Sequence, residues 1–207
     1  MQERHVTFRS EDLTLEGLLA MPAKAAGAGV VCHPHPQYGG SMDNNVVEAI
    51  LEALWALDYA TLRFNFRGVG ASEGSFADGV GEVLDAMAAV KFLAGQQSTG
   101  EGSMVLAGYS FGAMVALRAG LDLAEVGTLI AVAPAIGMVD LSFVVGTDKR
   151  IILVAGDSDP YCPVTQIRAL HKKLTGPSAV KVIKGADHFF GGCEAELARA
   201  IRDALGA

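Results

Sequence analysis

The sequence has few of the features that mark a secreted or metal-clustering protein. Its 207 residues include only three cysteines, Cys32, Cys162 and Cys193, which are widely spaced and form no C-x-x-C pair. An odd number of scattered thiols argues against a disulfide framework and against a structural zinc site. We therefore expect reduced thiols and no structural metal.

Long hydrophobic runs and an excess of basic residues are also missing. The N-terminal stretch MQERHVTFRSED lacks the apolar centre of a signal peptide, and no apolar run is long enough to cross a bilayer. The chain has 16 basic and 23 acidic residues, a net charge of −7, and thus no basic stripe for nucleic acid or an anionic membrane. We expect a cytoplasmic monomer or homodimer that acts on a small molecule.

What the sequence does contain is an alternation of apolar runs and amphipathic segments. With 51% hydrophobic residues and no linker, residues 1–207 have the size of a single domain. The order of these segments predicts an α/β fold, with a mainly parallel sheet and helices on both faces. Strands are predicted at residues 15–21, 27–32, 59–66, 103–108, 127–133, 150–156 and 179–185, the first at an antiparallel edge. Helices are predicted at residues 44–57, 80–93, 110–119, 164–174 and 194–205.

The segment SMVLAGYSFGAMVALRAG contains the pattern G-x-S-x-G between a predicted strand and a predicted helix. A turn this tight strains the backbone of Ser110, and side chains at Gly108 and Gly112 would collide with neighbouring chain. Ser110 is therefore the candidate nucleophile. The N–H of Phe111, at the start of the helix, is a candidate donor to an oxyanion.

A serine nucleophile needs a base, and on this architecture the base follows the serine in the sequence. Only two histidines lie downstream of Ser110. His171 falls within a predicted helix beside two lysines, where a solvated side chain is expected. His188 lies in the loop GADHFFGG after the last predicted strand, and is the predicted base.

The carboxylate that orients this base has three candidates. Asp157 and Asp159 follow a predicted strand in RIILVAGDSDPYCP, and Asp140 follows the preceding strand. Because Asp157 is well placed to bond its own backbone in a turn, we prefer Asp159, with Asp157 second and Asp140 third.

Several motifs together resemble a known family. GYSFG, GDSDPYCP and GADHFF look like the α/β-hydrolase superfamily, and HPHPQYGGSMDNNVV with LRFNFRGVGASEGSF is similar to a compact bacterial subgroup related to dienelactone hydrolases and carboxylesterases. The resemblance, which runs from about residue 30 to the C-terminus, implies the triad Ser110, Asp159 and His188. It implies a cofactor-independent serine hydrolase that cleaves carboxylic esters, thioesters or lactones through an acyl-enzyme. Only residues 134–149 occupy the usual place of a lid, so no large lid domain is expected.

The loop HPHPQYGG follows the predicted strand at residues 27–32. In the resembled fold this loop faces the serine turn and offers a second backbone N–H to the oxyanion. Pro34 and Pro36 have no N–H, which leaves His35 as the first candidate and Gln37 as the second. His35 is thus expected to act mainly through its backbone.

Two other functions remain open. His33 and His35 form an H-x-H pair at a strand end, as in some metal-dependent hydrolases, although the chain is shorter than the roughly 250 residues of a (β/α)₈ barrel. The glycines of RGVGASEG follow a strand as in a nucleotide-binding domain, but their spacing departs from G-x-G-x-x-G. For this segment we prefer a structural turn with positive φ at the glycines and Arg67 paired with a carboxylate.

Aromatic residues adjoin the predicted triad. Tyr109, Tyr161 and Phe189 are the candidates for substrate contact because each is a neighbour of Ser110, Asp159 or His188 in the sequence. Cys162 and Cys193 also approach this region, but nothing in the sequence indicates that either thiol is activated.

Overall fold

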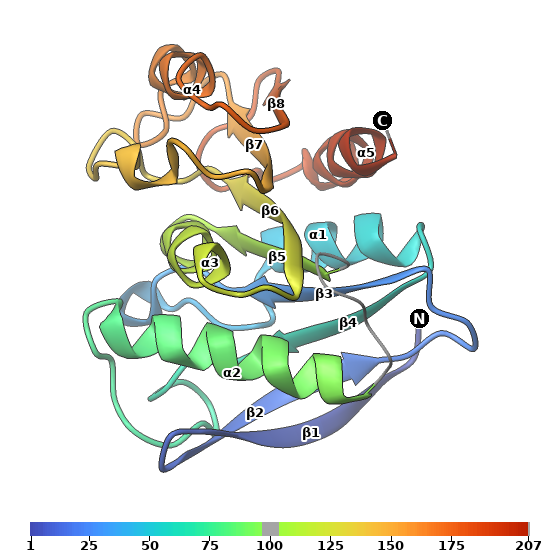
Figure 1. Cartoon of the computed structure of the whole chain (residues 1–207). Coiled ribbons are helices and arrows are strands. Elements are labelled where there is room, and N and C mark those ends of the chain that lie inside the picture. The colour runs from blue at the N-terminus through green and yellow to red at the C-terminus, as the bar shows by residue number, and fades with distance from the viewer. Residues whose placement is uncertain (97–103, 207) are drawn as a thin grey trace.

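A computed structural model of the chain describes residues 1–96 and 104–206. An eight-stranded sheet runs through the molecule, and helices cover both of its faces (Figure 1). The strands are β1 (Glu3–Ser10), β2 (Leu13–Ala20), β3 (Gly27–Cys32), β4 (Tyr59–Phe64), β5 (Met104–Tyr109), β6 (Val126–Val132), β7 (Arg150–Gly156) and β8 (Ser178–Ile183). The helices are α1 (Asn45–Trp55), α2 (Val80–Gln96), α3 (Phe111–Leu121), α4 (Val164–His171) and α5 (Glu194–Leu205), with short 3₁₀ turns η1 (Pro36–Tyr38) and η2 (Ser142–Val144).

The strand order confirms the mainly parallel sheet with an antiparallel edge. The order is β1-β2-β4-β3-β5-β6-β7-β8, in which β1, β2 and β4 pair antiparallel and all later pairs are parallel. After β3 the chain adds β4 on one side and then crosses to add β5 on the other. This crossing makes the carboxyl ends of β3 and β5 a topological switch point, where ligand sites gather in open α/β sheets.

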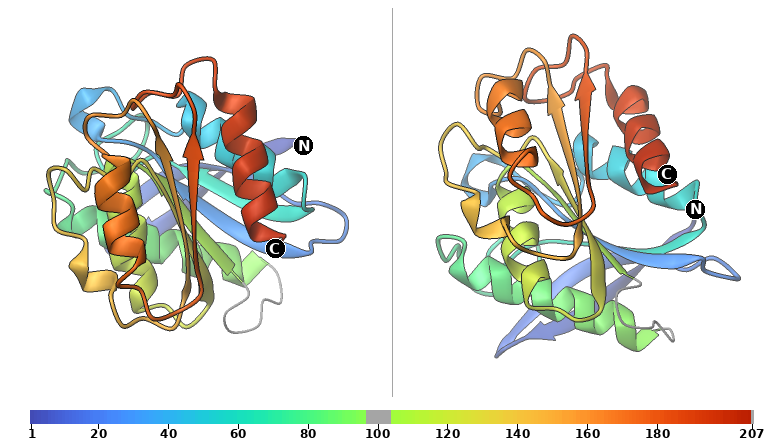
Figure 2. Two further views of the ribbon diagram at one scale, coloured as in Figure 1. Left: turned by 90° about the horizontal axis from the view of Figure 1, so that it is seen from above. Right: turned by 45° about the horizontal axis from the view of Figure 1, so that its top comes forward.

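The helices form two layers around the sheet, as the alternating pattern predicts. Helices α1 and α5 lie on one face, and α2, α3 and α4 lie on the other (Figure 2, left). All six residues of β5 are buried, as expected for a central strand covered on both faces. Among the described helices, none has the length and apolar character needed to cross a membrane.

The N-terminal strand β1 is the main element that the sequence prediction missed. No strand is predicted in this charged segment, yet Val6, Phe8 and Ser10 are buried in alternation with mostly exposed neighbours. This period of two is the ordinary signal of a strand with one covered face. The predicted strand at residues 103–108 begins at Ser103, which lies outside the described residues.

The connection between β6 and β7 is short. Residues 133–149 contain the 3₁₀ turn η2 and otherwise follow an irregular path. This short connection confirms the prediction that the fold has no large lid domain between β6 and β7. The loops at the carboxyl ends of the strands therefore have to supply the surroundings of the site themselves.

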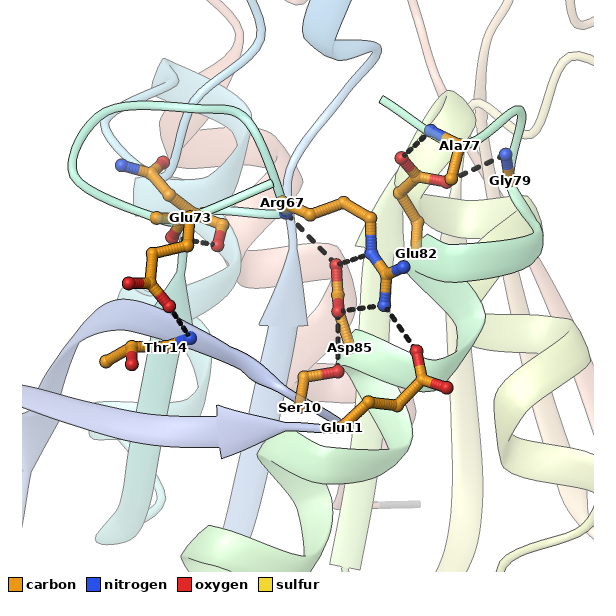
Figure 3. A network of polar contacts seen from close by, with 11 residues as sticks. Ser10, Glu11, Thr14, Arg67, Glu73, Ala77, Gly79, Glu82 and Asp85 are labelled. Carbon is orange, nitrogen blue, oxygen red and sulfur yellow. Dashed lines mark hydrogen bonds and ion pairs between the residues drawn. The ribbon is translucent and has the colours of Figure 1, made fainter. Parts of the chain in front are cut away.

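The glycine-rich turn after β4 is structural, as predicted. Gly68, Gly70 and Gly74 all have positive φ, of 76°, 58° and 86°. Arg67 pairs with the buried Asp85 of α2, with Nη2 2.8 Å from Oδ1 and Nε 3.0 Å from Oδ2 (Figure 3). The hydrogen bonds that Arg67 donates to Asp85 raise the pKa of the Arg67 guanidinium, so a permanently charged side chain holds the turn to α2.

Candidate active site

Ser110 occupies the sharp turn between β5 and α3. Its backbone is strained, with φ 54° and ψ −115°, a conformation that non-glycine residues rarely adopt. A Cβ on Gly108 would collide with the carbonyl of Gly112, and a Cβ on Gly112 would collide with the carbonyls of Cys32 and His33. The two glycines of the motif thus allow the turn to close and let α3 approach the end of β3.

Ser110 lies at one end of a chain of hydrogen bonds. Its Oγ is 3.0 Å from Nε2 of His188, and Nδ1 of His188 is 2.7 Å from Oδ2 of Asp159. A carboxylate only accepts, so Nδ1–H donates to Asp159, and Nε2 accepts from the serine hydroxyl. The structure therefore brings together three residues from loops that follow β5, β7 and β8.

Asp159 is held in a fixed orientation. Its side chain is fully buried, and Oδ1 accepts the N–H of Tyr161 at 2.8 Å and of Cys162 at 3.0 Å. The two competing carboxylates have other partners: Asp157 accepts the N–H of Gly185, and Asp140 caps Ser142. Of the three candidates, Asp159 is the one that contacts His188.

The loop after β3 presents His35 toward the serine turn, where its ring lies 4.8 Å from that of Phe111. The His35 carbonyl accepts the N–H groups of Tyr38 and Gly40, and Nδ1 accepts the N–H of Gln37 at 3.2 Å. The Gln37 N–H, our second candidate for the oxyanion, is thus already engaged. Within the described part of the chain, the N–H groups of His35 and Phe111 donate to no acceptor.

Comparisons with known proteins agree with this geometry. Residues 30–150 match the family described as serine aminopeptidase, S33. An α/β serine hydrolase homologue from Coxiella burnetii is 34% identical with a TM-score of 0.90, covering 99% of this chain and 98% of its own. The chain belongs to the α/β-hydrolase superfamily.

Other relatives of this hydrolase span nearly the same length. A Xanthomonas campestris protein described as a serine hydrolase without a lid is 31% identical with a TM-score of 0.88, and 100% of this chain and 94% of that chain are covered. An uncharacterised protein of Rickettsia prowazekii is 34% identical over 97% of this chain and 87% of its own. The similarity thus extends over the antiparallel edge as well as the parallel sheet.

The loop of the hydrolase that carries His188 is held by two residues, Tyr109 and Asn45. Neither of them was predicted from the sequence to have this role. The Tyr109 hydroxyl donates to the His188 carbonyl at 2.9 Å, and Asn45 Nδ2 donates to the Phe189 carbonyl at 3.1 Å. Tyr109 is only 3% exposed, so it lies beneath this loop and not in the substrate-contacting position that we predicted. Burial, with the charges of Asp159 and Asp187, raises the pKa of Tyr109 and keeps its hydroxyl a donor.

The H-x-H pair does not form a metal site in the hydrolase. The His33 ring is fully buried: Nδ1–H donates to the Pro34 carbonyl at 2.6 Å, and Nε2 accepts the N–H of Phe66 at 3.1 Å. Burial lowers the pKa of His33 to about 4. Both ring nitrogens of His33 are occupied, so the imidazole has no lone pair left for a metal ion.

Aromatic rings surround the serine turn on two sides. The rings of Tyr161 and Phe189 lie 5.0 Å and 5.7 Å from that of His188, and the two side chains are 45% and 63% exposed. On the other side, the His35 ring contacts those of Tyr38 and Phe76 at 4.8 Å and 4.9 Å. Tyr161 and Phe189 are thus exposed beside the His188 ring, and their contact with a substrate stays a prediction.

Cys162 does not have the surroundings of a reactive thiol. Burial, together with the charge of Asp159, raises the pKa of Cys162, which keeps this thiol protonated. Cys193 is half-buried at the start of α5. The hydroxyl of Ser110 is thus the better nucleophile in this part of the fold, because a base contacts it directly.

Proposed function

We propose that the protein is a serine hydrolase that cleaves carboxylic esters through an acyl-enzyme on Ser110. The observation that carries the proposal is the hydrogen-bonded chain from Ser110 Oγ through His188 to the buried Asp159. Membership of the α/β-hydrolase superfamily supports hydrolysis as the reaction type. The ester class is supported by the short connection between β6 and β7, which leaves no lid domain there, and by the exposed aromatic side chains next to His188.

In the acylation step, Ser110 Oγ attacks the ester carbonyl while its proton moves to Nε2 of His188. The carbonyl oxygen becomes an oxyanion, for which the N–H groups of Phe111 and His35 are the proposed donors. When the tetrahedral intermediate collapses, His188 gives the proton to the leaving alkoxide, and the alcohol departs.

Deacylation repeats these steps with water. His188 takes a proton from the water as it attacks the acyl carbonyl, and the acid is released when Ser110 recovers this proton. Asp159 holds the Nδ1–H of His188 throughout, so the imidazole remains in the tautomer that can accept at Nε2. The protein's own groups balance every proton, and no cofactor takes part in the cycle.

A labelling experiment with a matched serine variant tests the proposal. Wild-type protein should react covalently with a fluorophosphonate and should hydrolyse short-chain 4-nitrophenyl esters. Ser110→Ala should lose labelling and about 10⁵-fold or more of kcat. Ser158→Ala removes an exposed hydroxyl that bonds only Asp157, and should behave as wild type.

Two further arms separate this reaction from its alternatives. Chelators should leave the ester hydrolysis unchanged, because no step uses a metal ion. An alanyl 4-nitroanilide should be included because the matching family is described as an aminopeptidase. Absence of both labelling and turnover across esters, thioesters, lactones and the anilide would overturn the proposal.

A further inference from the structure

Exposed apolar side chains gather around the candidate site. Nine large hydrophobic residues are exposed within the described part of the chain. Most surface hydrophobics occur singly, so a group of them at one place suggests a contact surface. Five of the nine belong to segments at the carboxyl end of the sheet: Tyr38, Val80, Met138, Tyr161 and Phe189.

Contacts connect these side chains to the residues of the site. Tyr161 and Phe189 pack against the His188 ring, and Tyr38 packs against the His35 ring. The segment that carries Met138 lies beside Tyr161, since the N–H of Gly137 donates to the Tyr161 carbonyl at 3.0 Å. The apolar surface therefore extends on both sides of Ser110.

The loops at the carboxyl ends of the strands contain few basic residues. All 16 lysines and arginines fall within the described residues. Two of them adjoin the carboxyl ends of strands but are held in ion pairs: Arg63 by Glu3 and Asp43, and Arg67 by Asp85. Lys184 follows β8 in the loop that carries His188, and both Lys184 and Asp187 of this loop are exposed.

Carboxylates, by contrast, lie close enough to His35 and His188 to place negative charge at the site. Burial lowers the pKa of His35, while the charges of Glu82 and Asp78 oppose this shift. Asp187 is exposed next to His188, and its Oδ1 accepts the N–H of Phe189 at 2.9 Å. An anion bound against these aromatic rings would thus meet the carboxylate of Asp187, while Arg63 and Arg67 at the strand ends are already paired with carboxylates.

We propose that the site selects esters whose acyl and alcohol groups are uncharged, and that it discriminates against esters that carry an anionic group near the scissile bond. This inference rests on the proposed function and narrows its substrate class. A lactone bearing a carboxylate, or a thioester of a phosphate-bearing carrier, should be a poor substrate. Recognition of such groups normally uses arginine or lysine side chains.

A matched pair of substrates tests the inference. The 4-nitrophenyl ester of succinic acid carries a carboxylate at neutral pH, and its methyl ester has nearly the same shape without the charge. At low ionic strength, kcat/KM for the neutral ester should exceed that for the anionic ester by about tenfold or more. Added sodium chloride should reduce this ratio, because salt screens the repulsion at an open site.

A charge variant should change the same ratio. Asp187→Asn keeps an oxygen that can accept the Phe189 N–H and removes one negative charge, so kcat/KM for the anionic ester should rise about two- to threefold at low salt. The neutral ester should be unaffected. Asp203→Asn, an exposed site near the far end of α5, is the matched control and should leave both substrates unchanged.

The outcomes distinguish this inference from the function on which it rests. Equal turnover of the two succinate esters, with no effect of salt or of Asp187→Asn, would overturn charge selection while leaving ester hydrolysis intact. Failure to hydrolyse either ester, together with no fluorophosphonate labelling, would overturn the proposed function and the charge selection with it.

Discussion

Two buried carboxylates, Asp159 and Asp85, have similar surroundings but different basic partners. Both side chains are fully buried, and each accepts hydrogen bonds at both oxygens. Asp85 accepts hydrogen bonds from Nε and Nη2 of Arg67, from the Arg67 backbone N–H and from the Ser10 hydroxyl (Figure 3). Asp159 receives two backbone N–H groups and Nδ1 of His188.

The two carboxylates differ in the side chain that each one contacts, which is the guanidinium of Arg67 for Asp85 and the imidazole of His188 for Asp159. A guanidinium keeps its proton at all ordinary pH values, so Asp85 and Arg67 form a permanent pair that joins the end of β1, the turn after β4 and helix α2. An imidazole can gain and lose a proton, so His188 can pass one between Ser110 and a substrate. Burial alone therefore does not identify a reactive carboxylate; its partner does.

Asp159→Asn should produce the largest effect on catalysis among the predictions that separate the two centres. The amide NH₂ would face Nδ1 of His188, which would have to accept and would move the ring proton to Nε2. The imidazole could then no longer accept from Ser110, and kcat should fall by about 10⁴-fold. Steady-state kinetics with a short-chain aryl ester, beside a urea unfolding curve, measures this loss.

Asp157→Asn is the control for this change. Asp157 stands two residues away, accepts the N–H of Gly185, and makes no contact with His188. Its kcat should stay within about threefold of wild type. A larger loss for Asp157→Asn than for Asp159→Asn would show that the acid has been assigned to the wrong residue.

Asp85→Asn should act on stability instead. The substitution removes the buried counter-ion of the mostly buried Arg67, which then keeps only the exposed Glu11, and it turns an NH₂ group toward donors. The free energy of unfolding should therefore fall by about 3–5 kcal/mol. The folded fraction should retain its kcat, because Asp85 touches none of Ser110, His188 or Asp159. Urea unfolding measures the first effect, and kinetics on the folded protein measures the second.

Two controls sharpen the Asp85 prediction. Asp203→Asn breaks an exposed pair and should change the free energy of unfolding by less than about 1 kcal/mol. The double variant Asp85→Leu with Arg67→Met removes both charges and should recover part of the stability. A fully folded Asp85→Asn protein with a 10⁴-fold lower kcat would contradict the structural role of Asp85.

Much of the catalytic side of this comparison could be predicted from the sequence. G-x-S-x-G is a local pattern whose geometry follows from two close backbone approaches, and His188 was selected by its place after the last strand. The choice of Asp159 over Asp157 came from turn preference and from the family resemblance. The structure gives the physical reason, since Asp157 is engaged by Gly185.

The supporting contacts could not be predicted in this way. Asn45 and Phe189 are 144 positions apart, and Tyr109 and His188 are 79 apart, so nothing local in the sequence links them. The partner of Arg67 was predicted only as some carboxylate. Strand β1 is a different case, because the alternation of Val6 and Phe8 with polar residues is a local signal of a strand, although the segment is rich in charge.

Two buried histidines, His188 and His33, differ in the same way as the two carboxylates. His188 contacts a hydroxyl and a carboxylate, whereas both nitrogens of His33 are bound by backbone groups. Protonation of His33 would place a proton on Nε2, against the N–H of Phe66, in a fully buried site. His33 should therefore affect how the stability of the fold depends on pH, and should leave the chemical step alone.

The sign of this dependence follows from the pKa of His33, which burial lowers from its ordinary 6.5 to about 4. Between these values the unfolded chain binds a proton that the folded chain does not, so His33 contributes stability above pH 6.5 that is lost as the pH falls toward 4. Relative to His33→Gln, wild type should lose about 2.5 kcal/mol of unfolding free energy between pH 7.5 and pH 4.5. Urea unfolding of both proteins across this range measures the loss, and parallel stability curves would show that burial does not lower the pKa of His33 in the folded protein.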